Sequence, residues 1–479
     1  MRESVQEKGN NATHASRAIS VSADELLRAL LRLAPARRLS LLDSCGARNS
    51  ASRLLIAGFD PFEIIEARGN QLFITEGVGK VERVVPVDAL DLLDARLAQY
   101  KVESAALSSS AIVGACIGTF SYELGRRFER LRNSNPLEAD EPDAVLAFYD
   151  TLVIHDYRKG STEIVSMGGE RRLQETLKTL SESLHQAAND DESAFASVEE
   201  VSSNLSRDEY LVRIRRIKEH IAAGDIYQAN LTQRISCRMA RGTKPETIFL
   251  RLRRDHPASF AAFIRRRDDV IISASPERFL RVESNGKERR VEAWPIKGTR
   301  RRGSDPDEDA RLRAELLESE KDRAENVMIV DLLRNDLGRV CRYGTVEVVE
   351  LCALEEHPTL FHLVSKVRGT LREGVSVGEL LRATFPCGSI TGAPKIRAME
   401  IIDEIEPSPR GLSMGAVGYF SFDGRLDLSV AIRTMVLRDG VATFNVGGGV
   451  VADSCPSEEY EESLTKARAL LRALGVEDL

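Results

Sequence analysis

Acidic residues and glycines gather in one stretch near the C-terminal end, from Asn445 to Lys466. Gly447, Gly448 and Gly449 follow a strand-like segment, and a helix predicted to begin at Pro456 carries Glu459 and Glu462 on one face. Bare glycine backbone lets an anion reach main-chain N–H groups, and paired carboxylates suit a hard divalent cation. The stretch therefore predicts an anion site beside a cation site. The alternative is a loop followed by a solvated acidic first turn that complements the helix dipole.

A second pair of acids falls in the segment from Leu316 to Leu333, whose apolar residues recur at helical spacing and predict one long helix. Asp322 and Glu325 are three residues apart and lie beside the apolar stripe. Two such pairs on two helices could complete one Mg²⁺ site that keeps several waters and takes a substrate carboxylate. The alternative is that these acids pair with Lys321 and Arg323 on the helix surface.

Three single residues are of types that suit catalysis or substrate binding. Glu277 lies inside the apolar segment from Ile271 to Leu280, where a carboxylate is costly unless it is hydrogen-bonded or functional. Lys297, in PIKGT, follows closely on the only tryptophan, and a surface lysine is the alternative. His362, in FHLVS, is on an apolar strand-like segment, where a histidine satisfied within the core is the alternative.

The elements that must position these residues are a mixture of helices and strands. Residues 208–223 predict an amphipathic helix, and IYQANLTQRI after it predicts a strand with Gln228 and Asn230 as a buried polar pair. The Gly-rich turn FPCGSITGAPK, residues 385–395, precedes a further helix whose N-terminus is a potential anion site. The Asp/Glu/Ser-rich segment 185–207 is the best linker candidate.

Composition excludes several functional classes. The chain has 479 residues, 42% of them hydrophobic, which suffices for a large core. A net charge of −7 does not favour nucleic-acid binding, and the arginine run 265–267 is interpreted as solvated. No apolar run is long enough to span a bilayer, and the first twenty residues read as a flexible tail. Seven scattered cysteines without CxxC spacing indicate a reducing compartment, and the cytoplasm fits.

Ten ordered motifs together resemble the chorismate-utilising enzymes, which include anthranilate synthase component I, aminodeoxychorismate synthase component I, isochorismate synthase and salicylate synthase. The motifs run from about residue 205 to 475: GDIYQANLTQR, SPERF, PIKGT, KDRAENVMIVDLLRNDLGR, FHLVSKVRG, PCGSITGAPK, GAVGYFSFDG, AIRT, NVGGGVVADS and EEYEESLTKA. Any one of them would be weak alone, but ten in order are not expected by chance. Upstream, SLLDSCGA, from Ser40 to Ala47, resembles a segment that forms a tryptophan pocket in relatives.

The resemblance implies an α+β fold: one large four-layer α/β/β/α body with two packed, mostly antiparallel sheets. Residues 21–190 would complete the sandwich, residues 205–479 would form the chorismate-binding catalytic region, and the predicted linker would cross the surface of the body.

The resemblance also assigns roles residue by residue. Glu325 and Glu462 would be direct Mg²⁺ ligands, with Asp322 and Glu459 supporting them through water, and the ion would hold the ring carboxylate of chorismate. Glu277 would be the general acid that releases the C4 hydroxyl as water, and Lys297 the nucleophile. The enolpyruvyl carboxylate would be bound by Arg433 and by the backbone of the three glycines. The same pocket would be lined by Lys466, His362 and Thr391.

Two positions choose the reaction within this family. A lysine at the position of Gln228 activates water in isochorismate and salicylate synthases, and glutamine cannot act as that base. PIKGT, with Lys297, is similar to aminodeoxychorismate synthase, whereas anthranilate synthases usually carry alanine there. One departure is Ser413, which stands where relatives usually have an aromatic residue.

The expected reaction is therefore conversion of chorismate and ammonia to 4-amino-4-deoxychorismate, on the path to para-aminobenzoate and folate. Ammonia would come from a separate glutaminase subunit, component II, because the chain has no amidotransferase segment. The alternatives are anthranilate synthesis, on the path to tryptophan, and a non-catalytic relative that binds a dicarboxylate.

Overall fold

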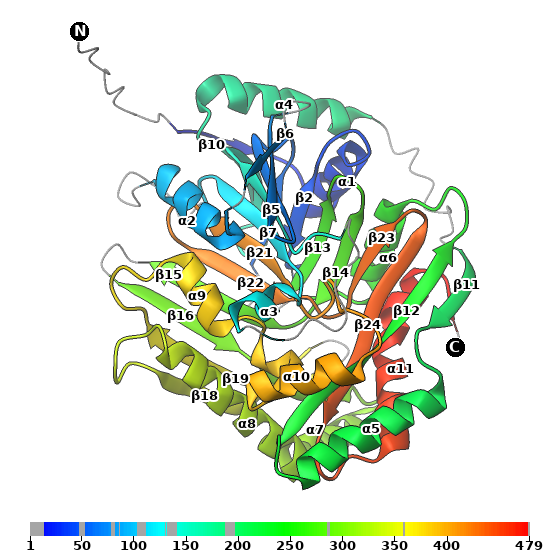
Figure 1. Ribbon diagram of the computed structural model, residues 1–479. Helices are drawn as coiled ribbons and strands as arrows, with labels where there is room; N and C mark the ends of the chain where they lie inside the picture. The colour runs from blue at the N-terminus through cyan, green and yellow to red at the C-terminus, as the bar shows by residue number, and fades with distance from the viewer. Residues whose placement is uncertain are drawn as a thin grey trace.

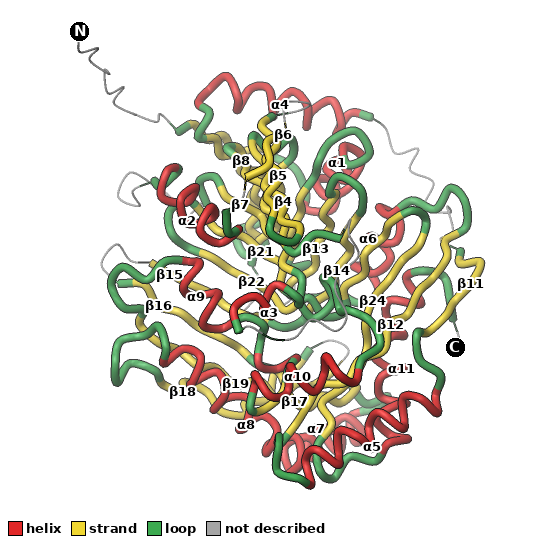
Figure 2. The backbone as a smooth tube through the Cα atoms, viewed as in Figure 1, coloured by secondary structure: helices red, strands yellow, loops and turns green. Residues whose placement is uncertain are grey.

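The computed structural model describes residues 14–46, 53–77, 82–85, 87–102, 112–129, 131, 141–186, 197–284, 288–357 and 360–477. In this part of the chain, helices lie outside two large β-sheets (Figures 1 and 2). No helix in the same ranges is both long and apolar enough to cross a bilayer.

Sheet A combines strands from both halves of the chain, and its pairings are antiparallel. Its order is β1 (Ala15–Ile19), β10 (Ser161–Ser166), β9 (Thr151–Asp156), β3 (Leu54–Gly58), β2 (Ser40–Asp43), β13 (Phe260–Arg265), β14 (Val270–Ser275), β23 (Thr434–Arg438), β24 (Val441–Val450), β12 (Gln228–Met239) and β11 (Val198–Ser203). The short β20 (Gly392–Ala393) also pairs with β12.

Sheet B is built in the same way, with antiparallel pairings throughout its described strands. Its order is β17 (Ile296–Arg301), β19 (Leu360–Thr370), β16 (Arg289–Trp294), β15 (Arg278–Ser284), β22 (Leu426–Val430), β21 (Ala416–Ser421), β7 (Ala115–Phe120), β8 (Ala144–Tyr149), β4 (Glu63–Arg68), β5 (Gln71–Glu76) and β6 (Glu82–Val85). In addition, β18 (Glu347–Glu356) pairs with β19.

Three hydrophobic clusters define the layers. One lies between the sheets and includes Ile117, Tyr149 and Ile271. A second joins sheet A to α1 (Ala23–Leu33), α4 (Gly169–His185), α6 (Pro245–Asp255) and α11 (Pro456–Ala473). A third joins sheet B to α2 (Ala89–Gln99), α8 (Glu320–Gly338) and α9 (Val377–Thr384). The predicted four-layer α+β body with two packed antiparallel sheets is therefore confirmed.

The remaining helices cover the ends of the sandwich. Next to β12 lie α5 (Arg207–Ala222) and α10 (Lys395–Ile405), and α7 (Pro306–Glu318) lies next to β17. The chain also has α3 (Leu124–Phe128) and a 3₁₀ turn at Gly388–Ile390.

The structure differs from the sequence predictions in several places. Residues 15–19, in the predicted tail, form β1 and pair with β10, and residues 1–13 lie outside the described ranges. Within the predicted linker, 198–203 form the edge strand β11 and 187–196 are outside the description. The arginine run is not wholly solvated, because Arg266 is buried against Asp269.

The predicted helix from Leu316 to Leu333 is two helices, α7 and α8. Ser319 takes an extended backbone (ψ 104°), and its hydroxyl accepts a hydrogen bond from the Asp322 amide as the cap of α8. The break places Asp322 and Glu325 in the first two turns of a new helix rather than in the middle of a long one.

Candidate active site

Two of the three glycines of β24, Gly447 and Gly449, lie in very close contact with neighbouring groups. Gly447 is paired with Thr232 of β12, and a Cβ there would lie 1.8 Å from the Leu231 carbonyl oxygen. At Gly449 a Cβ would lie 1.9 Å from Gln228 Nε2. At Gly447 the obstacle is main chain, so bare backbone is a requirement of packing there, whereas at Gly449 two side-chain ends would have to move.

Lys297 and Glu325 meet in the interior of the site. Lys297, on β17, places Nζ 2.9 Å from Glu325 Oε1 and donates to the Ser389 carbonyl at 3.1 Å. Burial works to lower the pKa of Lys297, but the adjacent Glu325 carboxylate outweighs it, so the pKa is raised. Burial opposes ionisation of Glu325 as well, and Lys297 and Gln228 more than offset it, so the pKa of that acid is lowered. Lys297 is thus not a surface lysine.

The acids of α11 face the same glycines and are also paired with cations. Lys466 Nζ lies 2.8 Å from Glu462 Oε1 and donates to the Gly447 carbonyl, also at 2.8 Å. Glu459 is almost fully buried and accepts a 2.6 Å hydrogen bond from the Ser454 hydroxyl. Burial raises the pKa of Glu459, whereas Lys466 lowers that of Glu462. Glu459 is therefore not part of a solvated first turn, whereas the Glu462 side chain is exposed and is held by its ion pair with Lys466.

Three carboxylates converge on two adjacent glycines. A Cβ at Gly448 would lie 3.2 Å from Glu459 Oε2 and 3.7 Å from Glu462 Oε1, and one at Gly449 would lie 2.7 Å from Glu325 Oε1. Hard oxygen donors of this kind fit Mg²⁺. In the part of the chain that is described, however, no three acidic, histidine or cysteine side chains lie close enough together to enclose a metal ion. The acids are instead paired with cations, and Asp322 lies 3.2 Å from Arg300.

Glu277 occupies the crossing between the two sheets. The apolar segment from Ile271 to Leu280 contains the end of β14 in sheet A and the start of β15 in sheet B, and Glu277 lies between these strands. Its side chain is buried, and Oε1 has no hydrogen-bond partner among the described residues. Burial raises the pKa of Glu277, an effect that the Ser389 hydroxyl and the Lys297 ammonium partly offset. A buried carboxyl with a raised pKa can hold a proton for transfer.

Arg433 lies near His362 and has an unusual backbone conformation. It adopts a positive φ of 48°, and none of the described residues makes a hydrogen bond or ion pair with its guanidinium. Burial lowers the pKa of Arg433. His362, on β19, hydrogen-bonds Thr299 through Nδ1 at 2.8 Å. Burial, with help from Arg433 and His357, lowers the pKa of His362 to about 3, so the imidazole is neutral at physiological pH.

The strand β12 contributes buried polar groups, as its sequence predicted. Gln228 Nε2 donates to Glu325 Oε1 at 2.7 Å, which turns Gln228 Oε1 away without a partner in the described structure. The Asn230 amide donates to the Thr391 carbonyl at 2.8 Å, and the Thr391 side chain is fully buried. Ser413 accepts from the Asn445 amide at 3.1 Å, so it serves the β24 backbone where an aromatic residue was expected.

Sequence reasoning missed the residues that hold these groups in place. Ser389 contacts Lys297 through its carbonyl and affects Glu277 through its hydroxyl. Its position in the Gly-rich turn PCGSITGAPK was the available signal. Thr299, Ser454 and Arg300 are spread along the chain, and nothing local marks them.

A separate cavity of about 330 Å³ lies between the sheets. It is lined by Ser44 of SLLDSCGA, by Phe260, and by Arg278, which directly follows Glu277. Ser44 Oγ and Arg278 Nη1 are buried and lack a partner within the described ranges. The cavity therefore offers both donors and apolar surface to a small ligand.

Known proteins resemble this chain in sequence and in fold. Residues 40–472 match the family described as chorismate binding enzyme. Aminodeoxychorismate synthase component 1 from Klebsiella aerogenes is 38% identical over 432 residues, covering 88% of this chain and 93% of that protein. Anthranilate synthase component 1 from Aquifex aeolicus is 38% identical over 374 residues, covering 76% and 74%. The structure of anthranilate synthase component I from Streptococcus pneumoniae superimposes with a TM-score of 0.76 at 29% identity, covering 88% of this chain and 93% of that one.

Proposed function

The chain belongs to the chorismate-binding enzyme family, and we propose that it is an aminodeoxychorismate synthase component I, which converts chorismate and ammonia to 4-amino-4-deoxychorismate. The observation that carries this proposal is the buried Lys297, held by Glu325 and Ser389 in the same site as the acid Glu277. The similarity to aminodeoxychorismate synthase component 1, which extends over most of both chains, supports the same choice.

The proposed reaction uses two displacements around the ring. Lys297 Nζ attacks C2 of chorismate, the ring double bonds shift, and the C4 hydroxyl leaves as water with the proton that Glu277 supplies. Ammonia then adds at C4, the double bonds shift back, and the lysine leaves C2. The net change is substitution of the C4 hydroxyl by an amino group with release of one water, para to the ring carboxylate.

The two carboxylates of chorismate would be bound by opposite parts of the site. Arg433, which has no counter-charge among the described residues, would take the enolpyruvyl carboxylate, with the backbone of the β24 glycines beside it. His362, Thr391 and Lys466 would line the same pocket. The neutral state of His362 avoids a second cation where the neutral ring must lie.

Mg²⁺ would be held by Glu325 and Glu462, with Asp322 and Glu459 supporting them. When bound, the ion supplies charge to the ring carboxylate and thereby orients C2 and C4. The convergence of three of these acids on Gly448 and Gly449 supports the assignment. The lysines that now pair with Glu325 and Glu462 would have to release them.

Three alternative activities are less well supported. Water addition at C2 needs a base where Gln228 stands, and its amide cannot take a proton. Anthranilate synthesis places ammonia at C2, which Lys297 would occupy. A non-catalytic dicarboxylate sensor would not need Glu277, whose carboxyl is buried at a cost that simple binding does not repay.

Ammonia would be supplied by a glutaminase subunit, aminodeoxychorismate synthase component II. The word "component" in the relatives' names supports a partner of this kind. We also propose a cytoplasmic location, because all seven cysteines are free thiols.

Product identification tests the proposal directly. The purified chain, incubated with chorismate, Mg²⁺ and ammonium at alkaline pH, should form 4-amino-4-deoxychorismate by liquid chromatography and mass spectrometry. Without ammonia, intact-protein mass spectrometry should show a chorismate-derived adduct that Lys297→Ala lacks. Lys366→Ala is the matched control, because Lys366 is similarly buried and also pairs with a glutamate, Glu350, at 2.9 Å. Anthranilate as the product, or an undiminished rate in Lys297→Ala, would refute the covalent-lysine mechanism.

The cavity beside SLLDSCGA is proposed as a tryptophan pocket. The Ser44 hydroxyl and Arg278 Nη1 are donors without a partner among the described residues, and Phe260 offers an apolar wall. The other two nitrogens of the Arg278 guanidinium are paired with Asp427 at 2.9 Å. Isothermal titration calorimetry with tryptophan should show saturable binding that Ser44→Ala weakens. If the titration releases no heat of binding, the pocket assignment is wrong.

A further inference from the structure

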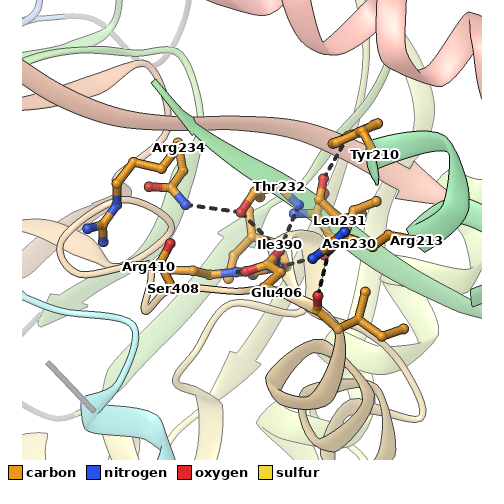
Figure 3. A network of polar contacts seen from close by, with 12 residues as sticks. Tyr210, Arg213, Asn230, Leu231, Thr232, Arg234, Ile390, Glu406, Ser408 and Arg410 are labelled. Carbon is orange, nitrogen blue, oxygen red and sulfur yellow. Dashed lines mark hydrogen bonds and ion pairs between the residues drawn. The ribbon is translucent and has the colours of Figure 1, made fainter. Parts of the chain in front are cut away.

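Arg410 is buried in the middle of a polar network (Figure 3). Its Nε and Nη2 donate to the two oxygens of Glu406, at 2.8 and 2.7 Å, in a bidentate pair. Glu406 also accepts from the Thr232 amide at 2.7 Å, which ties the pair to strand β12. Buried ion pairs of this kind often contribute little net stability, so this pair calls for another explanation than stability.

The other donors of Arg410 reach backbone carbonyls of two segments that build the site. Nη2 donates to the Asn230 carbonyl at 2.6 Å, on β12, and Nη1 donates to the Ile390 carbonyl at 2.8 Å, in the 3₁₀ turn. Figure 3 shows Glu406 and the backbone of Asn230 and Ile390 gathered around this one guanidinium. A single rigid fork therefore sets the spacing between β12 and the turn.

Three consecutive carbonyls of this turn are each held by a different group. The Ser389 carbonyl accepts from Lys297, the Ile390 carbonyl from Arg410, and the Thr391 carbonyl from the Asn230 amide. A shift of the central peptide would therefore move the carbonyl that positions Lys297. The same shift would move the Ser389 hydroxyl, which acts on Glu277.

Arg410 is itself fixed from the N-terminal part of the chain. Its backbone amide donates to Glu123 Oε1 at 2.7 Å, and the next amide, of Gly411, donates to Oε2 at 3.0 Å. The guanidinium carbon also lies 4.5 Å from the centre of the Tyr122 ring. The Arg410 guanidinium is therefore held by its hydrogen bonds and by the Tyr122 ring, and it has little freedom to move.

We propose that Arg410 is a positioning residue for the amination reaction. It holds the Gly388–Ile390 turn against β12, and through Ser389 it sets where Lys297 and Glu277 stand relative to each other. The inference rests on the function proposed above and concerns a residue whose guanidinium donates to protein groups.

Arg410→Lys tests the proposal in the full-length chain. Lysine keeps the charge beside Glu406 but cannot reach Glu406 and two carbonyls at once. We expect kcat for amination to fall by about 100-fold, as for a displacement near 1 Å at the reacting groups, with little change in the KM for chorismate. Hydrogen exchange of backbone amides in residues 387–393 should become faster in the same variant.

Arg266→Lys is the matched control. Arg266 is also buried and binds Asp269 through two hydrogen bonds of 2.6 Å, but its third contact is the Thr119 hydroxyl rather than a site carbonyl. This variant should keep kcat and the exchange pattern of 387–393. Equal kcat values in the two variants, or unchanged exchange in Arg410→Lys, would overturn the proposal.

A second variant guards against loss of folding. Glu406→Gln keeps an acceptor for Thr232 but loosens the bidentate grip on Arg410, so kcat and exchange should shift in the same direction by a smaller amount. If Arg410→Lys does not fold, a wild-type kcat and wild-type exchange in Glu406→Gln refute the role. If the wild-type chain makes a different product, the proposed function fails separately, and the exchange contrast still decides whether Arg410 holds the turn.

Discussion

Alanine substitutions at the three glycines of β24 should separate folding from catalysis. At Gly449, a Cβ would lie 1.9 Å from Gln228 Nε2 and 2.7 Å from Glu325 Oε1, both side-chain ends that can move. The Gln228 amide must retreat by about 1 Å, which breaks its 2.7 Å hydrogen bond to Glu325. We expect kcat/KM to fall by about 100-fold, since misplacement of that size at a reacting site has this effect.

At Gly447 the obstacle is main chain. The Leu231 carbonyl oxygen would lie 1.8 Å from the new Cβ, and it cannot move without disturbing the β12–β24 ladder. Gly447→Ala should lower the free energy of unfolding by about 1–3 kcal/mol, the usual cost of overpacking a core. At Gly448 the nearest atom is Glu459 Oε2 at 3.2 Å, so the substitution should be the mildest of the three.

The assay pairs urea unfolding, followed by circular dichroism, with the rate of ammonium-dependent turnover of chorismate. Gly449→Ala should unfold at the same urea concentration as the wild type but convert chorismate slowly. Gly447→Ala should unfold at a lower urea concentration. Wild-type activity in Gly449→Ala, or equal destabilisation by both substitutions, would refute the reasoning that Gln228 and Glu325 line the reacting side of β24.

Three further predictions concern the metal, the partner and pH. Glu325→Ala or Glu462→Ala should abolish Mg²⁺-dependent turnover while the thermal unfolding curve stays that of a folded chain, because each removes a ligand but little core packing; full activity in either would exclude that residue as a ligand. The chain alone should use ammonium and not glutamine, and glutamine should support turnover only after a glutaminase subunit is added; glutamine-driven turnover by the pure chain would contradict this. Burial raises the pKa of Glu123 from 4.5 to about 7. Between these two pH values the folded chain holds a proton that the unfolded chain has lost. The free energy of unfolding should therefore fall by about 3 kcal/mol at most as the pH rises from the lower value to the higher one. Glu123→Gln should flatten that decline in urea titrations at several pH values, and an unchanged slope would show that other groups cause it.

The sequence predicted those parts of the site that depend on local spacing. Glu459 and Glu462 share a helical face because they are three residues apart. The glycines of β24 indicated that other groups lie close to the backbone there. The helix break at Ser319 was also within reach of local reasoning, since a serine followed three residues later by Asp322 is a capping signal. It was missed because apolar residues keep helical spacing across the break.

Long-range pairing could not be predicted in the same way. Glu277 lies in an apolar run that reads as one strand, and only the assembly of two sheets shows that the run crosses between them. The sequence around Arg410 gives no sign of its role, because its partners Glu123, Asn230 and Ile390 come from segments far apart in the chain. The fold itself was inferred from the resemblance, since residue patterns gave elements but not their order in the sheets.

Each of the four acids proposed to hold the metal is paired with one cation, and this arrangement bears on how a lysine can act as nucleophile. Burial by itself favours the neutral amine of Lys297, and the Glu325 carboxylate reverses that preference. A ligand that takes over Glu325 would remove the opposing charge and leave the amine in surroundings that favour its reactive form. Under the proposed function, Lys297 is therefore protected by its ion pair until the site is filled, and the other acids are neutralised in the same way. These acid–cation pairs are Glu325–Lys297, Glu462–Lys466, Glu459–Lys321 and Asp322–Arg300.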